Sequence, residues 1–234
     1  MKAILALLLA GKISQVITSG GSMLLSIFAY AWVYGWKYAF GIMAMLFAHE
    51  SGHYIASKKR GMNVGAPTFI PFVGAWIELK DQPMDAETEA FVGIAGPMLG
   101  SAAAFICYML GRNYGSNLLL AISYSGFVLN LFNLIPITPL DGGRIVAAIS
   151  PKIWILGVPL LIGLFVWKPS PLLLMIAFVA ALQVWSILRN KSVLSSRYYQ
   201  TPLQVRLQYT AQYLLLACFL AVMAYEVHEG LRGA

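Results

Sequence analysis

Residues 43–56 read MAMLFAHESGHYIA, an apolar run that a single polar motif interrupts. The motif holds two of the chain's three histidines, His49 and His53, four residues apart. On an α-helix this spacing places both imidazoles on one face, roughly 6 Å apart along the axis. Two imidazole nitrogens so placed can reach one tetrahedral zinc ion, and Glu50 between them can face a water molecule on the metal. The stretch therefore predicts a metal site on a helix surrounded by apolar sequence.

The composition is that of a membrane protein. Of the 234 residues, 59% are hydrophobic and 11% are charged, whereas soluble domains carry about 25% charged residues. We therefore expect an all-α polytopic membrane protein that forms a single domain over residues 1–234. The net charge of +7 comes from basic residues scattered between apolar spans, which favours the positive-inside rule over nucleic-acid binding. The expected surroundings are a lipid bilayer, with no nucleic-acid partner.

The apolar segments predict six to seven transmembrane segments. They lie at about 21–36, 38–57, 90–111, 117–132, 153–167, 171–188 and 207–227. Residues 1–15 imitate a signal peptide, but Lys12 interrupts the place where a cleavage region should be. We expect this end to be retained as an interfacial helix.

Two segments do not fit a regular spanning helix. Residues 64–79 are too short and are broken by Pro67, Pro71 and Gly74, and the alternation at their end predicts an extended hairpin or re-entrant segment. Residues 133–144 read NLIPITPLDGGR, and two prolines with two glycines exclude a regular helix there. Irregular backbone at membrane depth is tolerated only where it lines an enclosed or water-filled cavity, so the second segment is a candidate part of the site.

Two acidic residues point to the same site as the histidines. Of the nine acids, only Glu50 and Asp141 lie in apolar sequence away from a loop or terminus. A carboxylate in lipid is costly and by default marks a functional site. One zinc ion would serve both acids, with Asp141 as a third ligand beside His49 and His53 and with Glu50 bonded to the metal's water. Two neutral histidines, one aspartate and a hydroxide neutralise Zn²⁺, and three protein ligands leave the open position of a catalytic zinc.

The basic residues also predict an orientation. If the N-terminus is cytosolic, twelve Lys and Arg residues lie inside, and four lie outside: Lys37, Arg112, Lys168 and Arg232. This orientation places His53 and Asp141 together toward the cytosolic half. We therefore expect a multi-pass protein of the cell membrane with its site on that side.

Small residues open the predicted span at 90–111, which begins with GIAGPMLG at residues 93–100. Small side chains let helix backbones approach closely in lipid. The pattern fits generic packing and a tailored fit against the metal helix equally well.

The two motifs together, HESGH at 49–53 and NLIPITPLDGG at 133–143, resemble the site-2 protease family, the intramembrane zinc metalloproteases of peptidase family M50. The Gly96-Pro97 pair between them also resembles the family core. The resemblance covers about residues 38–150, which it implies to be the catalytic core, with accessory spans at 1–37 and 151–234.

The resemblance also implies residue roles. It implies one Zn²⁺ per chain, with Glu50 as general base and with these metal ligands: His49, His53 and Asp141. It further implies that Asn133 helps to hold the substrate carbonyl or the developing oxyanion. The residues alone leave another role open, because an amide at membrane depth needs partners and could instead tie down the broken helix.

The activity that the resemblance implies is a zinc metalloendopeptidase acting on transmembrane segments. The family's substrates are single-span membrane proteins such as anti-sigma factors or membrane-tethered transcription factors. A helix hides its peptide bonds, so a transmembrane substrate must unwind before water can attack it. The segment at 64–79 could then pair with the unwound substrate as an added strand. Many family members carry a PDZ or CBS domain; neither fits this sequence, and we expect a minimal form.

Two other classes of function compete with this one. A membrane metal transporter would spread its ligands along a path, whereas here they close one three-ligand site beside an acid placed for proton transfer. A non-cleaving pseudoprotease that binds transmembrane segments is disfavoured because both histidines, Glu50 and Asp141 are all present.

Overall fold

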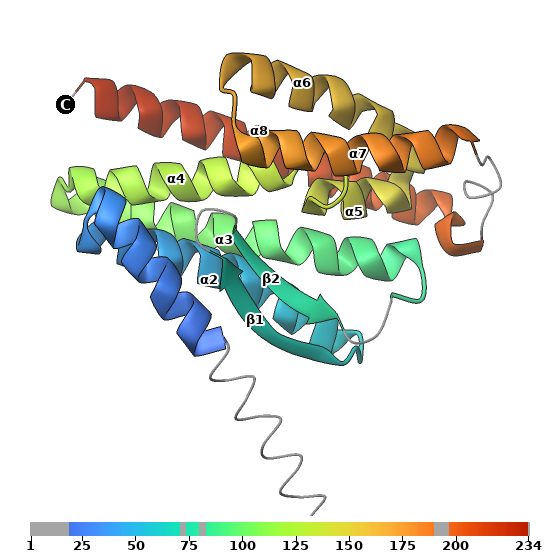
Figure 1. Ribbon diagram of the computed structural model, residues 1–234, viewed down its shortest axis with the longest axis horizontal. Helices are drawn as coiled ribbons and strands as arrows, with labels where there is room; N and C mark the ends of the chain where they lie inside the picture. Colours follow the sequence, from blue (N-terminus) through green and yellow to red (C-terminus); the bar gives the residue numbers. More distant parts are fainter. Residues whose placement is uncertain (1–18, 71–73, 80–82, 190–196, 234) are drawn as a thin grey trace, which may run out of the picture.

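The computed structural model describes residues 19–70, 74–79, 83–189 and 197–233, which form a group of packed helices with one β-hairpin (Figure 1). In this view the hairpin and the helix over residues 19–34 lie on one side of α3 and α4, and the α6–α7 pair lies on the other. The interfacial helix expected over residues 1–15 lies outside the described residues.

The elements follow the predicted segments closely. After helical residues 19–34 come α2 (Trp36–Lys59), β1 (Val64–Ile70), β2 (Gly74–Leu79), α3 (Ala86–Tyr114), α4 (Asn117–Asn133), α5 (Asp141–Ile149), the 3₁₀ helix η1 (Pro151–Leu156), α6 (Gly157–Trp167), α7 (Pro171–Arg189), the 3₁₀ helix η2 (Arg197–Tyr199) and α8 (Leu203–Arg232). The helical fold and the hairpin are as predicted. Within the described part of the chain, α3 and α8 are the helices long and apolar enough to cross a membrane, so a count of six to seven spans stays a prediction.

The irregular segment is shorter than predicted. The expectation that residues 133–144 contain no regular helix was wrong at both ends, because α4 continues through Asn133 and α5 begins at Asp141. Glycine is unfavourable inside a helix by about 1 kcal/mol, but it allows close approach of another backbone. A Cβ on Gly142 would lie 2.2 Å from the Leu134 carbonyl oxygen, and one on Gly143 would lie 2.4 Å from the Ile137 carbonyl carbon. The two glycines thus let residues 134–140 fold back over the start of α5.

Side chains from elsewhere in the chain hold this region in place. The indole Nε1 of Trp154 donates to the Gly143 carbonyl at 2.8 Å, and the Thr201 hydroxyl donates to the Ala148 carbonyl at 2.6 Å. The Tyr213 hydroxyl donates to the carbonyl of Leu134, just past the end of α4, at 2.5 Å. These bonds give partners to backbone carbonyls of α5 and of the residue just past α4.

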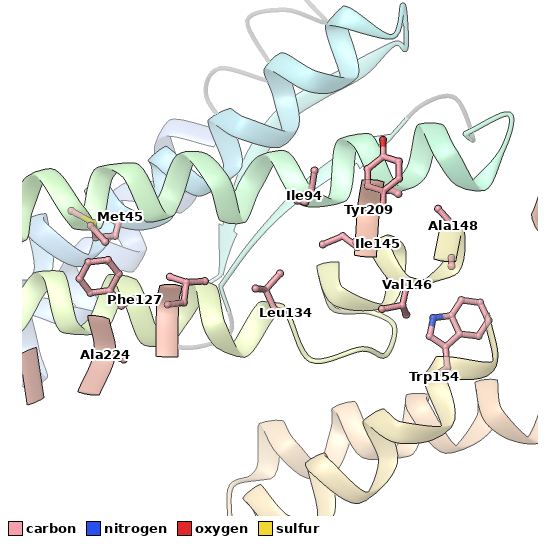
Figure 2. Close-up of a cluster of buried hydrophobic side chains, with 14 of the residues drawn as sticks. Met45, Ile94, Phe127, Leu134, Ile145, Val146, Ala148, Trp154, Tyr209 and Ala224 are labelled. Atoms are coloured by element: carbon pink, nitrogen blue, oxygen red, sulfur yellow. The ribbon is translucent and has the colours of Figure 1, made fainter. Parts of the chain in front are cut away.

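The main core joins α5 to its neighbours. Ile145 and Val146 are fully buried, and they belong to a cluster with Ile94 of α3, Phe127 of α4 and Tyr209 of α8 (Figure 2). The start of α5 therefore has little freedom to move relative to α3 and α4.

A second set of contacts ties η2 to two other elements. The Tyr198 hydroxyl donates to Glu89 Oε2 at 2.6 Å, and the Tyr199 ring packs edge-on against Trp154 with centroids 6.0 Å apart. Burial, together with the Glu89 carboxylate, raises the pKa of Tyr198, so the hydroxyl keeps its proton and remains the donor. The segment before α8 is thus connected both to the first turn of α3 and to η1.

The two strands of the hairpin have different neighbours. β1 and β2 pair antiparallel, with Pro67 opposite Ile77. The Phe69 N–H donates to the Ser22 hydroxyl at 3.0 Å, and the Phe69 side chain is buried in a cluster with Ile27 and Met43. The outer side of β1 therefore faces the helix over residues 19–34. β2 pairs only with β1 among the residues that the structure describes.

Gly52 sets the distance between α2 and α3. A Cβ there would lie 2.2 Å from the Ala95 carbonyl oxygen, so the two backbones are in direct contact. We expect Gly52→Ala to lower the free energy of unfolding in detergent by about 1–3 kcal/mol, because the helices must separate to admit the methyl group. Gly163→Ala in α6, where a Cβ would meet nothing within 4 Å, is the matched control and should not destabilise the protein. Equal thermal midpoints for the two variants would contradict this account of the helix contact.

Candidate active site

The three predicted ligands converge on one point. His49 Nε2 and His53 Nε2 are 3.1 Å apart, and Asp141 Oδ2 lies 3.1 Å from the first and 3.2 Å from the second. The side chains come from α2 and from the first residue of α5, and the three residues are 3%, 6% and 6% exposed. Within the described residues they form a group that could hold a metal ion.

These separations suit a tetrahedral zinc ion. Zinc binds imidazole nitrogen and carboxylate oxygen at about 2.0–2.2 Å, which places neighbouring ligand atoms about 3.3–3.5 Å apart at tetrahedral angles. The distances of 3.1–3.2 Å between the three atoms are close to this edge length. Three ligands leave one coordination position open.

The hydrogen bonds around the rings fix which nitrogens carry protons. His53 Nδ1 lies 2.8 Å from the Val92 carbonyl oxygen, which can only accept, so Nδ1 is the donor. The amide Nδ2 of Asn130 donates to the Gly126 carbonyl at 2.7 Å, so the amide oxygen faces His49 Nδ1 at 2.8 Å and accepts. Both rings thus carry a proton at Nδ1, and in the neutral imidazole Nε2 then carries the lone pair that a metal ligand needs.

This arrangement of donors suits a cation. With both rings neutral, two nitrogen lone pairs and a carboxylate oxygen face one another, which is repulsive in a buried site. A divalent ion among them turns the repulsion into three coordination bonds and offsets the burial of the Asp141 charge. The donor set therefore fits the zinc ion that the sequence predicts.

Glycines on α3 give the site its space. A Cβ on Gly96 would lie 2.2 Å from His53 Nε2, and one on Gly100 would lie 2.4 Å from Asn130 Oδ1. The small residues at the start of this span are therefore fitted to the metal helix and its partners, which decides between the two interpretations left open by the sequence.

The other two predicted site residues have different surroundings. Glu50 is 6% exposed, and its carboxyl group interacts electrostatically with both imidazoles and with Asp141. Asn133 is half-buried, and its Nδ2 donates to the Leu129 carbonyl in the same helix at 3.0 Å. An amide nitrogen has two N–H donors, so this bond leaves one for another partner.

Asn130, which contacts His49, was not predicted from the sequence. The argument that singled out Asn133, an amide within apolar sequence, applies equally to Asn130 one turn earlier in α4. The family motif begins at residue 133, so the resemblance does not extend to Asn130.

Comparison with known proteins gives the same family. Residues 37–122 match the model of peptidase family M50, a segment that contains His49, Glu50 and His53. The chain is related to peptidase family M50. The resemblance seen in the first motif is thereby confirmed, whereas the second motif, with Asn133 and Asp141, lies beyond the matched segment.

Curated relatives of this chain are named as zinc metalloproteases. "Zinc metalloprotease MJ0392" of Methanocaldococcus jannaschii is 33% identical over 109 residues, which are 44% of this chain and 31% of that protein. "Probable zinc metalloprotease EGY1, chloroplastic" of Arabidopsis thaliana is 30% identical over 78 residues, 31% of this chain and 14% of that protein. The chain thus spans a third or less of the length of these relatives. Zinc is the metal that the family and these relatives indicate.

A solved structure also resembles this one. The site-2 protease from Methanocaldococcus jannaschii matches with a TM-score of 0.47 and 19% identity, over 77% of this chain and 87% of that one.

Gly96 offers a direct test of the fitted site. Gly96→Ala should weaken zinc binding by at least about tenfold, because its Cβ would occupy the space of His53 Nε2. Gly111→Ala is the matched control, since its Cβ would also be crowded on α3, 2.9 Å from Leu120 Cδ2, but away from the ligands. Zinc affinity is measured by competition with a chromophoric chelator in detergent. The prediction is wrong if both variants bind zinc like the unmodified protein.

Proposed function

We propose that this protein is an intramembrane zinc metalloendopeptidase of the site-2 protease type, hydrolysing peptide bonds within or near transmembrane segments of other membrane proteins. The observation that carries the proposal is the convergence of two imidazole nitrogens and one carboxylate oxygen at 3.1–3.2 Å, buried beside a second acid. A structural zinc site would be closed by a fourth protein ligand, whereas three leave room for a reactant.

Glu50 is the proposed general base. When bound, zinc supplies a Lewis acid that acidifies water and polarises a carbonyl group. Glu50 takes a proton from the attacking water as the new C–O bond forms, and it passes that proton to the amide nitrogen as the C–N bond breaks. Its burial beside the two ligands on α2 favours this role, because a carboxylate there is shielded from bulk water but close to the reacting atoms.

Asn133 is the proposed partner of the substrate carbonyl. Its Nδ2 has one N–H on the Leu129 carbonyl and a second available to donate. A donor aimed at the carbonyl oxygen stabilises the charge that develops there during attack. Residues 134–140, directly after it, depart from helical geometry and bring Asp141 back toward α2.

The proposed setting is a multi-pass protein of the cell membrane. The catalytic core is residues 38–150, and the active site lies toward the cytosolic half because the basic residues are concentrated on that side. The proposed substrate is a single-span membrane protein, such as an anti-sigma factor or a membrane-tethered transcription factor.

The hairpin is proposed to hold the unwound substrate. Peptide bonds in a helix are closed to attack, and an extended chain can pair with the open edge of a strand. The outer side of β1 faces the helix over residues 19–34 through the Phe69–Ser22 bond, and among the described residues β2 has no strand on its other side. The substrate would therefore add beside β2.

Replacement of the base tests the activity. Glu50→Gln should lower the cleavage rate of a co-expressed single-span substrate by about 10²–10⁴-fold while zinc content stays at one per chain, because the amide cannot accept the proton. Glu226→Gln makes the same change at an exposed position of α8 and should cleave normally. Cleavage is followed by immunoblot and zinc by elemental analysis.

The same pair of variants separates the other functions. A transporter would move metal regardless of the change at Glu50, and a pseudoprotease would show no cleavage by the unmodified chain. Either result would count against the proposed activity.

A backbone change in β2 tests the substrate strand. Ile77→Pro should slow cleavage without loss of zinc, because proline removes an N–H from the strand that the substrate is proposed to join. Ile77→Val keeps that N–H and is the matched control. Unchanged cleavage by the proline variant would rule out β2 as the docking edge.

A further inference from the structure

The two ligand histidines are oriented by different kinds of acceptor. His53 donates its Nδ1 proton to a backbone carbonyl, that of Val92 on α3. His49 donates its Nδ1 proton to a side chain, the amide oxygen of Asn130 on α4, at 2.8 Å. One of the two imidazoles therefore depends on a residue that substitution can change.

The orientation of the Asn130 amide is itself fixed. Its Nδ2 donates to the Gly126 carbonyl at 2.7 Å, so the oxygen has to face the ring. The side chain is fully buried, and Gly100 on α3 leaves the space that its amide occupies. Asn130 is thus a buried amide with a defined partner on each side.

From this geometry we infer that Asn130 is a positioning residue: its amide oxygen holds His49 in the Nδ1-protonated tautomer, with the Nε2 lone pair directed at the metal. The inference rests on the zinc site of the proposed function and deepens it. Metal-ligating histidines are generally oriented by an acceptor on the other ring nitrogen, and loss of that acceptor weakens metal affinity by about 10–100-fold. An acceptor also raises the basicity of the ligating nitrogen.

Asn133 provides an internal control. Both asparagines donate Nδ2 to the carbonyl four residues earlier in α4, at Gly126 and at Leu129. Substitution of either residue removes the same kind of intrahelical bond. Substitution of Asn130 also removes the contact with His49. A difference in metal affinity between the Asn130 and Asn133 variants therefore reports on that contact.

The test measures zinc affinity of the full chain in detergent by chelator competition, with no substrate present. Asn130→Leu should bind zinc about 10–100-fold more weakly. Asn130→Asp keeps an acceptor oxygen facing His49 and should bind with near-normal affinity, and Asn133→Leu should do the same. The inference is overturned if Asn130→Leu binds zinc normally, or if Asn130→Asp is as weak as Asn130→Leu.

A second measurement needs no variant and so does not depend on how the substituted chains fold. In the zinc-loaded protein, ¹⁵N NMR of the histidine rings should show His49 with a protonated Nδ1 and a metal-bound Nε2. Metal on Nδ1 of His49 would overturn the inference. If the unmodified chain binds no zinc, the proposed function fails first, which is distinguishable from a failure confined to Asn130.

Discussion

The structure depends on the convergence of three ligand side chains at one buried point. Two nitrogen lone pairs and a carboxylate oxygen are held about 3 Å apart in a part of the protein that water hardly reaches. Each group alone is costly to bury, and a divalent cation shared by all three offsets that cost. The surrounding helices hold these side chains through contacts at other atoms, such as the hydrogen bonds from the two Nδ1 atoms.

The helices achieve this through close approach. Gly52 and Gly96 bring α2 and α3 together so that the His53 ring fits against the backbone of α3. Gly142 and Gly143 let the irregular residues 134–140 cross over the start of α5, which positions Asp141 relative to the two histidines. Larger side chains at these points would separate the elements, and the ligand atoms would no longer share a centre. The site therefore depends on small residues that allow close backbone contact.

Much of this could be predicted from the sequence, because the strongest signals are local. The spacing of His49 and His53, the isolated acids Glu50 and Asp141, and the prolines between Asn133 and Asp141 each have a short-range physical meaning. The helix α5 was missed because Gly142 and Gly143 are poor helix formers, and their tolerance depends on a backbone contact that no local pattern reveals. Asn130 is an amide in apolar sequence like Asn133, but its partner His49 is on another helix, 81 positions away, so the sequence alone does not reveal its contact with the site.

The placement of the ligands also constrains the order in which the protein can mature. Two ligands lie on one continuous helix, and the third arrives roughly ninety residues later, so a bound ion closes a long chain loop as a removable cross-link would. During synthesis α2 and α3 emerge well before Asp141. The site therefore cannot be completed until α4 and the start of α5 have been synthesised and Asp141 has reached the two histidines. Binding of the metal by all three ligands therefore comes late in folding, after the preceding helices have packed together.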